Sequence, residues 1–357
     1  MTPVAAIAAR EHHRFEAAGQ PYLYLVPSAA VVGLDPAADM VMQVIARGPQ
    51  TRDQVLGLAD GLFTAEEIDD AIRELLSMQA IGPASLPPPP SPKILPLTPV
   101  PLTTMVLNVT NQCNLACTYC YEYGEDKIVD TENGLQPKFM SLETAKASVE
   151  FMLKEAGDNK VAHITFFGGE TLMNFPVLKE TIAYARARGA EVGKLVDFSL
   201  TTNATLLKED VIEYLVENRV GVTISFDGPP EVQNKFRVFH NGRGSYDVAA
   251  PKIKALLEKH RSRTVGARVT LTSGNTDVRA IYEHLTGVLG FHEVGFAPVT
   301  TSPNRAYALD EAGYQQMLAQ FTSLAEDFKE AAIAGRHHGL DRKSTRLNSS
   351  HVSESRM

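Results

Sequence analysis

The stretch Met105-Val-Leu-Asn-Val-Thr-Asn-Gln-Cys113-Asn-Leu-Ala-Cys117-Thr-Tyr-Cys120 decides how this chain folds and what it can bind. An apolar, β-branched run, typical of a buried strand, leads into three cysteines, the only ones among 357 residues. Three thiolates can hold three irons of a cubane [4Fe-4S] cluster and leave the fourth iron open to a small molecule. Cys113, Cys117 and Cys120 are therefore the predicted metal ligands, and the open iron indicates chemistry rather than storage.

Composition excludes several classes of protein. With 44% hydrophobic and 21% charged residues, the chain is an ordinary globular protein long enough for two domains. The net charge of -8 and scattered basic residues argue against nucleic acid as a partner. No stretch approaches a membrane span, and the first residues lack the features of a signal peptide. Clustered thiols persist as metal ligands in a reducing compartment, so we expect a cytoplasmic protein.

A proline-rich segment divides the chain. Nine prolines lie between Pro83 and Pro101. Such a segment favours polyproline II, at about 3.1 Å per residue, and acts as a semi-rigid spacer. We predict a first domain over residues 1–82, a linker over 83–103 and a second domain that begins at residue 104.

The first domain contains signals for a hairpin and three helices. Two apolar runs, Tyr22–Val26 and Ala30–Leu34, flank a turn. Helix starts are indicated by Asp35-Pro36 and by capping boxes at Thr51 and Thr64. The third helix has a predicted apolar stripe, which consists of Ile68, Ile72, Leu75 and Leu76. A winged-helix-like fold is expected, with a generic structural cap as the alternative interpretation.

In the second domain, strand and helix signals alternate. Six apolar, β-branched runs predict strands, at residues 105–109, 162–167, 196–200, 220–226, 267–271 and 293–297. Helical patterns lie between them. Six βα units with right-handed crossovers predict an α/β fold with a parallel sheet, wrapped into an open or closed barrel. The functional site of such a fold lies at the carboxyl ends of the strands.

Polar and glycine-rich motifs follow the predicted strands. Gly168-Gly169-Glu170 comes after the second strand, Thr201-Thr-Asn203 ends the third and Ser225-Phe-Asp-Gly-Pro229 ends the fourth. Each of these motifs in isolation is also a common turn. His163, which alternates with Ile164 on a strand, is expected to be a satisfied face residue. The competing interpretation is a zinc site in which His163 completes a Cys₃His set.

Together, these motifs resemble those of the radical S-adenosylmethionine (SAM) enzymes. The pattern Cys-x-x-x-Cys-x-aromatic-Cys after the first strand carries the resemblance, which covers residues 104–308. It implies a partial (β/α)6 barrel, a [4Fe-4S] cluster and bound SAM. Tyr119 is expected to cover the molecule bound at the open iron.

The resemblance also implies roles for the later motifs. Gly168, Gly169 and Glu170 match the motif that holds the amino group of SAM, and Asn203 is expected at the same site. Ser225 and Arg237 match residues that contact the carboxylate and ribose region of the cofactor. Arg268 is expected to be a salt-bridged barrel residue rather than a second carboxylate partner.

Within the family, the motifs resemble the peptide and protein maturase branch. The implied mechanism is one-electron reduction of the cluster by a flavodoxin- or ferredoxin-like donor, cleavage of SAM and hydrogen abstraction by a 5′-deoxyadenosyl radical. The implied substrate is a peptide or small protein. The first domain of this chain, residues 1–82, would capture the leader of that substrate by strand addition. The expected product is a set of Cys-to-Asp/Glu thioether cross-links. A formylglycine-generating sulfatase maturase is the alternative enzyme, and a zinc-binding or electron-transfer protein is the alternative of another class.

The C-terminal region departs from the pattern of these maturases. Such enzymes usually carry a cysteine-rich module with auxiliary clusters, and its cysteines are absent here. We interpret residues 309–340 as the helical start of a truncated module. Auxiliary iron-sulfur clusters and the catalytic general base are expected only in a longer protein. Residues 341–357 resemble an in-frame translation of a sequencing adapter and are interpreted as an artefact.

Overall fold

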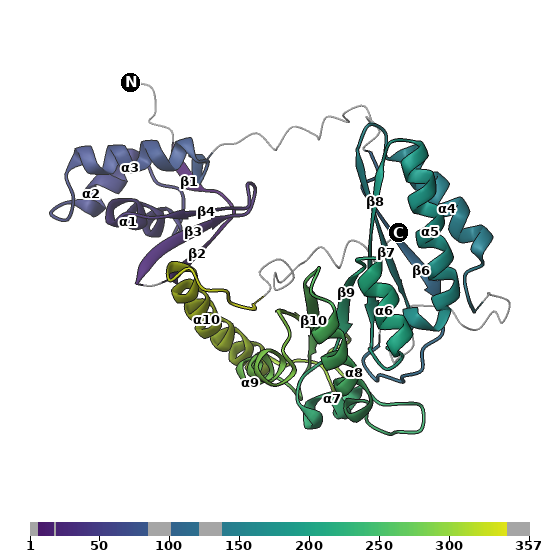
Figure 1. The fold of residues 1–357 in the computed structure, drawn as a ribbon. Helices are drawn as coiled ribbons and strands as arrows, with labels where there is room; N and C mark the ends of the chain where they lie inside the picture. Colours follow the sequence, from purple (N-terminus) through teal and green to yellow (C-terminus); the bar gives the residue numbers. More distant parts are fainter. Residues whose placement is uncertain (1–5, 18, 85–100, 121–137, 341–357) are drawn as a thin grey trace. The chain divides into compact units, whose positions relative to one another are not determined.

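The computed structural model describes residues 6–17, 19–84, 101–120 and 138–340 (Figure 1). The chain divides into two compact units, Met1–Pro99 and Val100–Met357. Most of the predicted linker, and all of the predicted artefact at 341–357, lie outside the described residues. Within the described part of the chain, no helix is long and apolar enough to cross a membrane.

The first unit combines two small antiparallel sheets with three helices. Strands β2 (His12–Ala17), β3 (Gln20–Leu25) and β4 (Ala30–Gly33) form one sheet, and β1 (Ile7–Ala9) pairs with β5 (Ile81–Pro83). The helices are α1 (Pro36–Ile45), α2 (Arg52–Ala59) and α3 (Ala65–Ser77). The predicted hairpin and helices are confirmed. The sequence did not predict β1, β2 and β5, because two of them have only three residues and β2 is largely polar.

Local capping and a separate core stabilise this unit. Both predicted capping boxes, at Thr51 and Thr64, are present. The core cluster includes Leu23, Val41, Val55, Ile68 and Leu75, each fully buried. The predicted stripe on α3 was wrong at one position: Leu76 is 41% exposed, whereas Ala71 is buried. Ala71 lies three residues after Ile68 and four before Leu75, so it fits the helical period better than Leu76 does.

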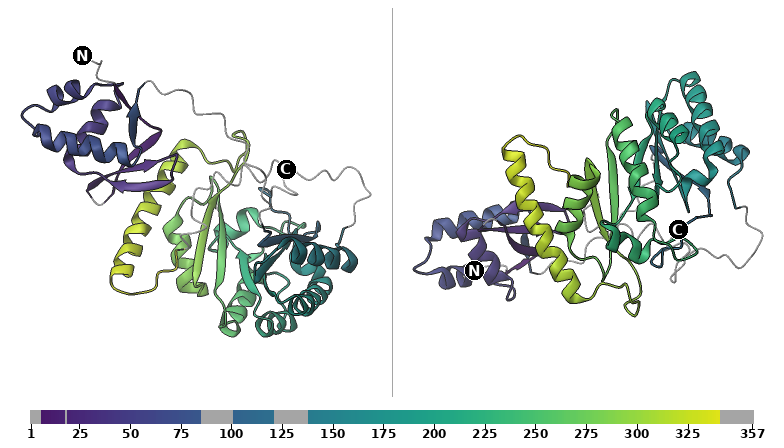
Figure 2. Two further views of the ribbon diagram at one scale, coloured as in Figure 1. Left: turned by 90° about the horizontal axis from the view of Figure 1, so that it is seen from above. Right: turned by 60° about the horizontal axis from the view of Figure 1, so that its bottom comes forward.

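The second unit is built on a six-stranded parallel sheet (Figures 1 and 2). Its strands are β6 (Thr104–Thr110), β7 (Val161–Gly168), β8 (Leu195–Thr202), β9 (Gly221–Ser225), β10 (Val265–Leu271) and β11 (Glu293–Pro298). They follow one another in sequence order across the sheet, with β6 and β11 at its edges. All six predicted strands are present, so the predicted α/β fold with a partial (β/α)6 barrel is confirmed.

Helices connect the strands of this sheet. They are α4 (Leu142–Glu155), α5 (Phe175–Glu191), α6 (Glu209–Glu217), α7 (Pro230–Phe236), α8 (Tyr246–Lys259) and α9 (Val278–Glu283), with short 3₁₀ and π turns at Thr171–Asn174 and His284–Leu289. After β11, α10 (Glu311–Ile333) packs against α9, which confirms the predicted helix in residues 309–340. Figure 1 shows α4 and α5 side by side along the sheet.

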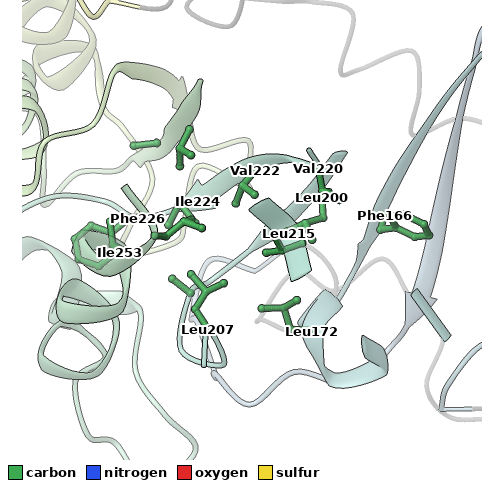
Figure 3. Close-up of a cluster of buried hydrophobic side chains, with 14 of the residues drawn as sticks. Phe166, Leu172, Leu200, Leu207, Leu215, Val220, Val222, Ile224, Phe226 and Ile253 are labelled. Carbon is green, nitrogen blue, oxygen red and sulfur yellow. The ribbon is translucent and has the colours of Figure 1, made fainter. Parts of the chain in front are cut away.

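The two faces of the sheet differ in chemistry. Buried apolar side chains, among them Phe166, Leu200 and Ile224, pack with helical residues into the main core (Figure 3). Alternating positions such as Thr165, Ser199 and Thr223 are polar and only half-buried. This alternation is the period-two pattern of strands covered by helices on one face. The loops after the carboxyl ends of the strands lie next to one another, because neighbouring strands are parallel.

Candidate functional site

The cysteine loop follows β6 and is held by the segment after α7. Cys113, Cys117 and Cys120 are partly exposed free thiols. The amide of Ala116 donates to the carbonyl of Val238 at 2.8 Å, and Leu115 forms an antiparallel bridge with Phe239. The ring of His240 contacts the Cys113 carbonyl at 3.0 Å. Residues more than 100 positions away therefore fix the path of the loop.

Gly168 and Gly169 bring the end of β7 against the same loop. A Cβ added at Gly168 would lie 2.3 Å from the carbonyl oxygen of Thr110, and one at Gly169 would lie 2.3 Å from that of Gln112. The Gly169 amide donates to Thr110 at 2.9 Å. Gly168 also has a φ of +136°, which disfavours other residues. The sequence matched these glycines to a motif that holds the amino group of SAM, and the structure adds a close approach to the backbone before Cys113.

Glu170 joins the ends of β7 and β8. Its buried carboxylate accepts hydrogen bonds from the Leu172 amide at 3.1 Å, the Thr202 hydroxyl at 2.6 Å and the Asn203 amide at 2.8 Å. Burial raises the pKa of Glu170, while these hydrogen bonds oppose the shift. A carboxylate has about four acceptor sites. Three are occupied by described residues, which fix the carboxylate between the two strand ends.

Asn203 lies directly beside the first cysteine. Its Nδ2 is 3.8 Å from the Cys113 sulfur and donates to Asn114 Oδ1 at 3.0 Å. Asn114 in turn donates to the Thr205 hydroxyl at 2.8 Å. Asn203 is thus placed to donate a hydrogen bond to the sulfur, and such contacts tune cluster potentials. Asn114 was not singled out from the sequence, since an asparagine between two cysteines reads as a turn residue.

Tyr119, a partly buried residue of the loop, forms a cluster with the buried Asp227 and Arg237. The Tyr119 hydroxyl donates to Asp227 Oδ2, and Arg237 Nε donates to the same oxygen at 3.0 Å. The Arg237 guanidinium also lies over the Tyr119 ring, 5.4 Å from its centre. Burial raises the pKa of Tyr119 well above its usual value. For Arg237, burial is the largest single effect and lowers the pKa, but the combined effects of Asp227, Tyr119 and Cys117 outweigh it and leave the pKa raised.

Asp227 was not predicted as a site residue. Asp-Gly is a common turn pair, and only its place within Ser-x-Asp-Gly-Pro signalled more. Ser225, which was predicted, ends β9 opposite Arg268 of β10 and is half-buried. The structure therefore places Ser225 two residues before the Tyr119–Asp227–Arg237 cluster.

Three free thiols on one loop suit the ligation of an iron-sulfur cluster. Burial raises the pKa of Cys113 to about 11 and that of Cys117 to about 12, so metal binding must displace protons. The three cysteines interact electrostatically. Among the described residues, no group of three or more His, Cys, Asp or Glu side chains surrounds one ion position. Cubane ligands need no such common point, because each thiolate binds a different iron.

His163 lies at the other end of the sheet. It pairs in register with Thr104, the first residue of β6, whereas the cysteine loop follows Thr110 at the end of that strand. Its Nε2 lies 2.8 Å from the Ser199 hydroxyl, and its Nδ1 lies 3.2 Å from Asp197. His163 is therefore a satisfied face residue, and it does not complete a zinc site with the three cysteines.

Comparison with known proteins defines the class. The family model described as "Radical SAM superfamily" matches residues 107–285, half of the chain. The chain belongs to this superfamily, as the cysteine motif predicted.

Individual relatives are more distant. A serine-type anaerobic sulfatase-maturating enzyme from Bacteroides thetaiotaomicron is 31% identical over 200 residues, 56% of this chain and 46% of that protein. The radical SAM cyclopropyl synthase TigE from Paramaledivibacter caminithermalis is 28% identical over 182 residues, 48% of this chain and 37% of that protein. The chain spans less than half the length of these relatives.

A solved structure shares the fold. The structure titled "Native anSMEcpe with bound AdoMet" superimposes with a TM-score of 0.57 at 22% identity, over 67% of this chain and 64% of that one. This similarity supports the barrel fold described above.

Proposed function

We propose that this chain is a radical SAM enzyme that modifies a peptide or protein substrate. Cys113, Cys117 and Cys120 hold a [4Fe-4S] cluster, and SAM binds at its open iron. One observation carries the proposal: a three-thiol loop lies between the ends of β7 and β8 on one side and the buried Arg237 on the other. The bound cofactors supply a 5′-deoxyadenosyl radical. The protein supplies the orientation of these groups.

The polar groups at this site match the two ends of the methionine part of SAM. The proposed partner of the ammonium group is Glu170, whose carboxylate the ends of β7 and β8 hold in place. Arg237 donates from Nε to Asp227, and the described residues make no hydrogen bond to its Nη atoms. Four N–H groups therefore remain for a carboxylate, which the planar guanidinium recognises well. Ser225, Tyr119 and the backbone of Gly168 and Gly169 complete the proposed cofactor site.

Anaerobic reconstitution tests this function. After incubation with iron and sulfide, the reduced chain should give the electron paramagnetic resonance (EPR) signal of a [4Fe-4S] cluster, which SAM should change. Reductant and SAM should then give 5′-deoxyadenosine. Replacing any one of the three cysteines with alanine should abolish both, whereas His163→Ala should abolish neither. Binding of a single zinc ion by the three cysteines, with no iron cluster, would instead support a zinc-binding protein. A cluster whose EPR signal does not change when SAM is added would support an electron-transfer protein.

We propose the maturation protein of quinohemoprotein amine dehydrogenase as the particular enzyme. In this proposal, the substrate is the small subunit of that dehydrogenase, in which Cys sulfur is joined to side-chain carbons of Asp or Glu. Residues 1–82 act as a winged-helix-like peptide-recognition domain, followed by a linker. The separate core of the first unit and the exposed edge of its β2–β3–β4 sheet support this assignment. A flavodoxin- or ferredoxin-like protein supplies the electron.

A sulfatase maturase is the second candidate, and its similarity to this chain over 200 residues supports it. The two candidates differ in what happens to the modified residue of the substrate, a cysteine for the thioether and a serine or cysteine for formylglycine. Thioether formation removes two hydrogens and consumes the thiol, whereas formylglycine formation creates an aldehyde that reacts with hydrazides. Mass spectrometry of both substrates, after alkylation and hydrazide labelling, therefore discriminates them. An aldehyde on the sulfatase peptide, with an unchanged amine dehydrogenase subunit, would overturn the thioether assignment.

A further inference from the structure

We propose that Asp227 is the positioning residue of the cofactor site: its carboxylate orients Arg237 and Tyr119 around the cysteine loop and ties both to strand β10. This inference rests on the proposed function, because it concerns how the same site binds SAM.

The carboxylate of Asp227 is a buried junction between three segments. Its side chain is only 2% exposed. Oδ2 accepts from Tyr119 on the cysteine loop and from Arg237 after α7, and Oδ1 accepts from the Thr270 amide of β10 at 3.0 Å. Buried carboxylates are costly unless paired and hydrogen-bonded, and this one has both kinds of partner. Its removal would leave Arg237 buried without its counter-charge.

A ring of hydrogen bonds fixes Asp227 itself. Its amide donates to the side-chain oxygen of Gln233 at 2.8 Å, and Gln233 Nε2 donates to the Ser245 hydroxyl at 2.9 Å. Ser245 donates to the carbonyl of Arg237 at 2.7 Å. Gln233 and Ser245 are completely buried. The Asp227–Arg237 ion pair closes this ring, so the backbone position of Arg237 and the direction of its side chain are set together.

Arg237 is held in one orientation through only one of its N–H donors. Asp227 engages Nε, one of five N–H groups on the guanidinium. The ring of Tyr119, itself held by Asp227, lies under the guanidinium plane. Two contacts thus restrict the rotation of the Arg237 side chain, and its Nη donors remain for the cofactor. An arginine held in this way loses less rotamer entropy on binding than a free one.

A double-mutant cycle tests the coupling. The dissociation constant for SAM is measured on the reconstituted chain by equilibrium dialysis, and cofactor binding is also read from the change in the cluster EPR signal. Asp227→Asn should weaken SAM binding by about tenfold or more, since Arg237 is no longer held in the orientation for its charge-assisted contact to the cofactor carboxylate. Arg237→Gln should do the same. The double variant should bind like Arg237→Gln alone, because Asp227 acts through Arg237.

Controls separate positioning from folding. Asp197→Asn removes another Asp–Arg pair, with Arg263, on the neighbouring strand and should leave the SAM dissociation constant unchanged. Asp227→Glu should restore binding in part. Additive effects in the cycle, or an Asp227→Asn chain that binds SAM normally, would overturn the inference. If the wild-type chain assembles no cluster or does not bind SAM, the proposed function itself fails; that result is distinct from an additive cycle.

Discussion

Replacing Gly169 with alanine should displace the cysteine loop. The added Cβ would lie 2.3 Å from the Gln112 oxygen, 2.6 Å from its carbonyl carbon and 3.1 Å from the Cys113 nitrogen. Ordinary van der Waals contact begins at 3.4 Å, so the two segments must separate by roughly 1 Å. The backbone atoms that must move belong to the ligand Cys113 and the residue before it. Gly169 does not have a positive φ, so the effect comes from this contact and not from backbone strain.

The expected cost has two parts. Overpacking of a close contact costs about 1–3 kcal/mol. Separation also weakens two hydrogen bonds, Gly169 to Thr110 at 2.9 Å and Glu170 to Gln112 at 2.8 Å, at about 1 kcal/mol each. The free energy of unfolding should therefore fall by about 3–5 kcal/mol. Iron incorporation should fall as well, because the displaced loop no longer presents Cys113 in line with the other thiols.

Urea unfolding and iron analysis after reconstitution measure these two effects. Gly287→Ala is the matched control, because its added Cβ would meet no atom within 4 Å and its φ is not positive. That variant should keep its iron and most of its stability. If Gly169→Ala incorporates iron and unfolds like the wild type, the close approach described here is incorrect.

Four further outcomes are expected. Glu170→Gln should lower the free energy of unfolding, measured in urea, by about 1–3 kcal/mol. The NH₂ group of the new glutamine would face one of the three donors that bond to the Glu170 carboxylate, and that hydrogen bond would be lost. His163→Ala should keep the iron-to-protein ratio of the wild type. A lower ratio would indicate that His163 is a metal ligand after all. Arg188 and Tyr184 lower the pKa of Glu150 to about 2, below the 4.5 of the free side chain, so its ionised form stabilises the fold above pH 4.5 and this contribution is lost as the pH falls towards 2. The stability difference between the wild type and Glu150→Gln should shrink over that range in acid titrations followed by circular dichroism, and a constant difference would contradict the described contacts. A fragment of residues 1–84 should unfold cooperatively by itself, because its core cluster draws only on residues between Ile7 and Ile81; a fragment without a thermal transition would refute this.

The sequence predicted those features that depend on local pattern. Alternating apolar runs identified all six strands of the sheet, and capping boxes identified helix starts at Thr51 and Thr64. The cysteine spacing predicted the family, which the match over residues 107–285 confirms. In each case, neighbouring residues carry the signal.

Contacts between distant residues were not predictable in this way. Tyr119 and Asp227 are 108 residues apart, and the hydrogen bond between them depends on how the β9 end meets the cysteine loop. The role of Gly169 against Gln112 similarly requires the register between β6 and β7, in which a bulge occurs after Asn108. A tight turn and a close backbone contact both require glycine, so the sequence alone could not show which of the two reasons applies to Gly169.

These contacts have a consequence for cluster assembly. The end of β7 holds the cysteine loop through Gly169 and Glu170, and the segment after α7 holds it through Val238 and His240. All of these are contacts of the protein with itself. In small metal-dependent domains, by contrast, metal binding supplies the free energy of folding. Here the large apolar core of the sheet supplies it, and the fold itself holds the loop through the contacts above. Cluster binding then requires less ordering of the loop, and the affinity for iron depends on residues such as Gly169 that are not ligands.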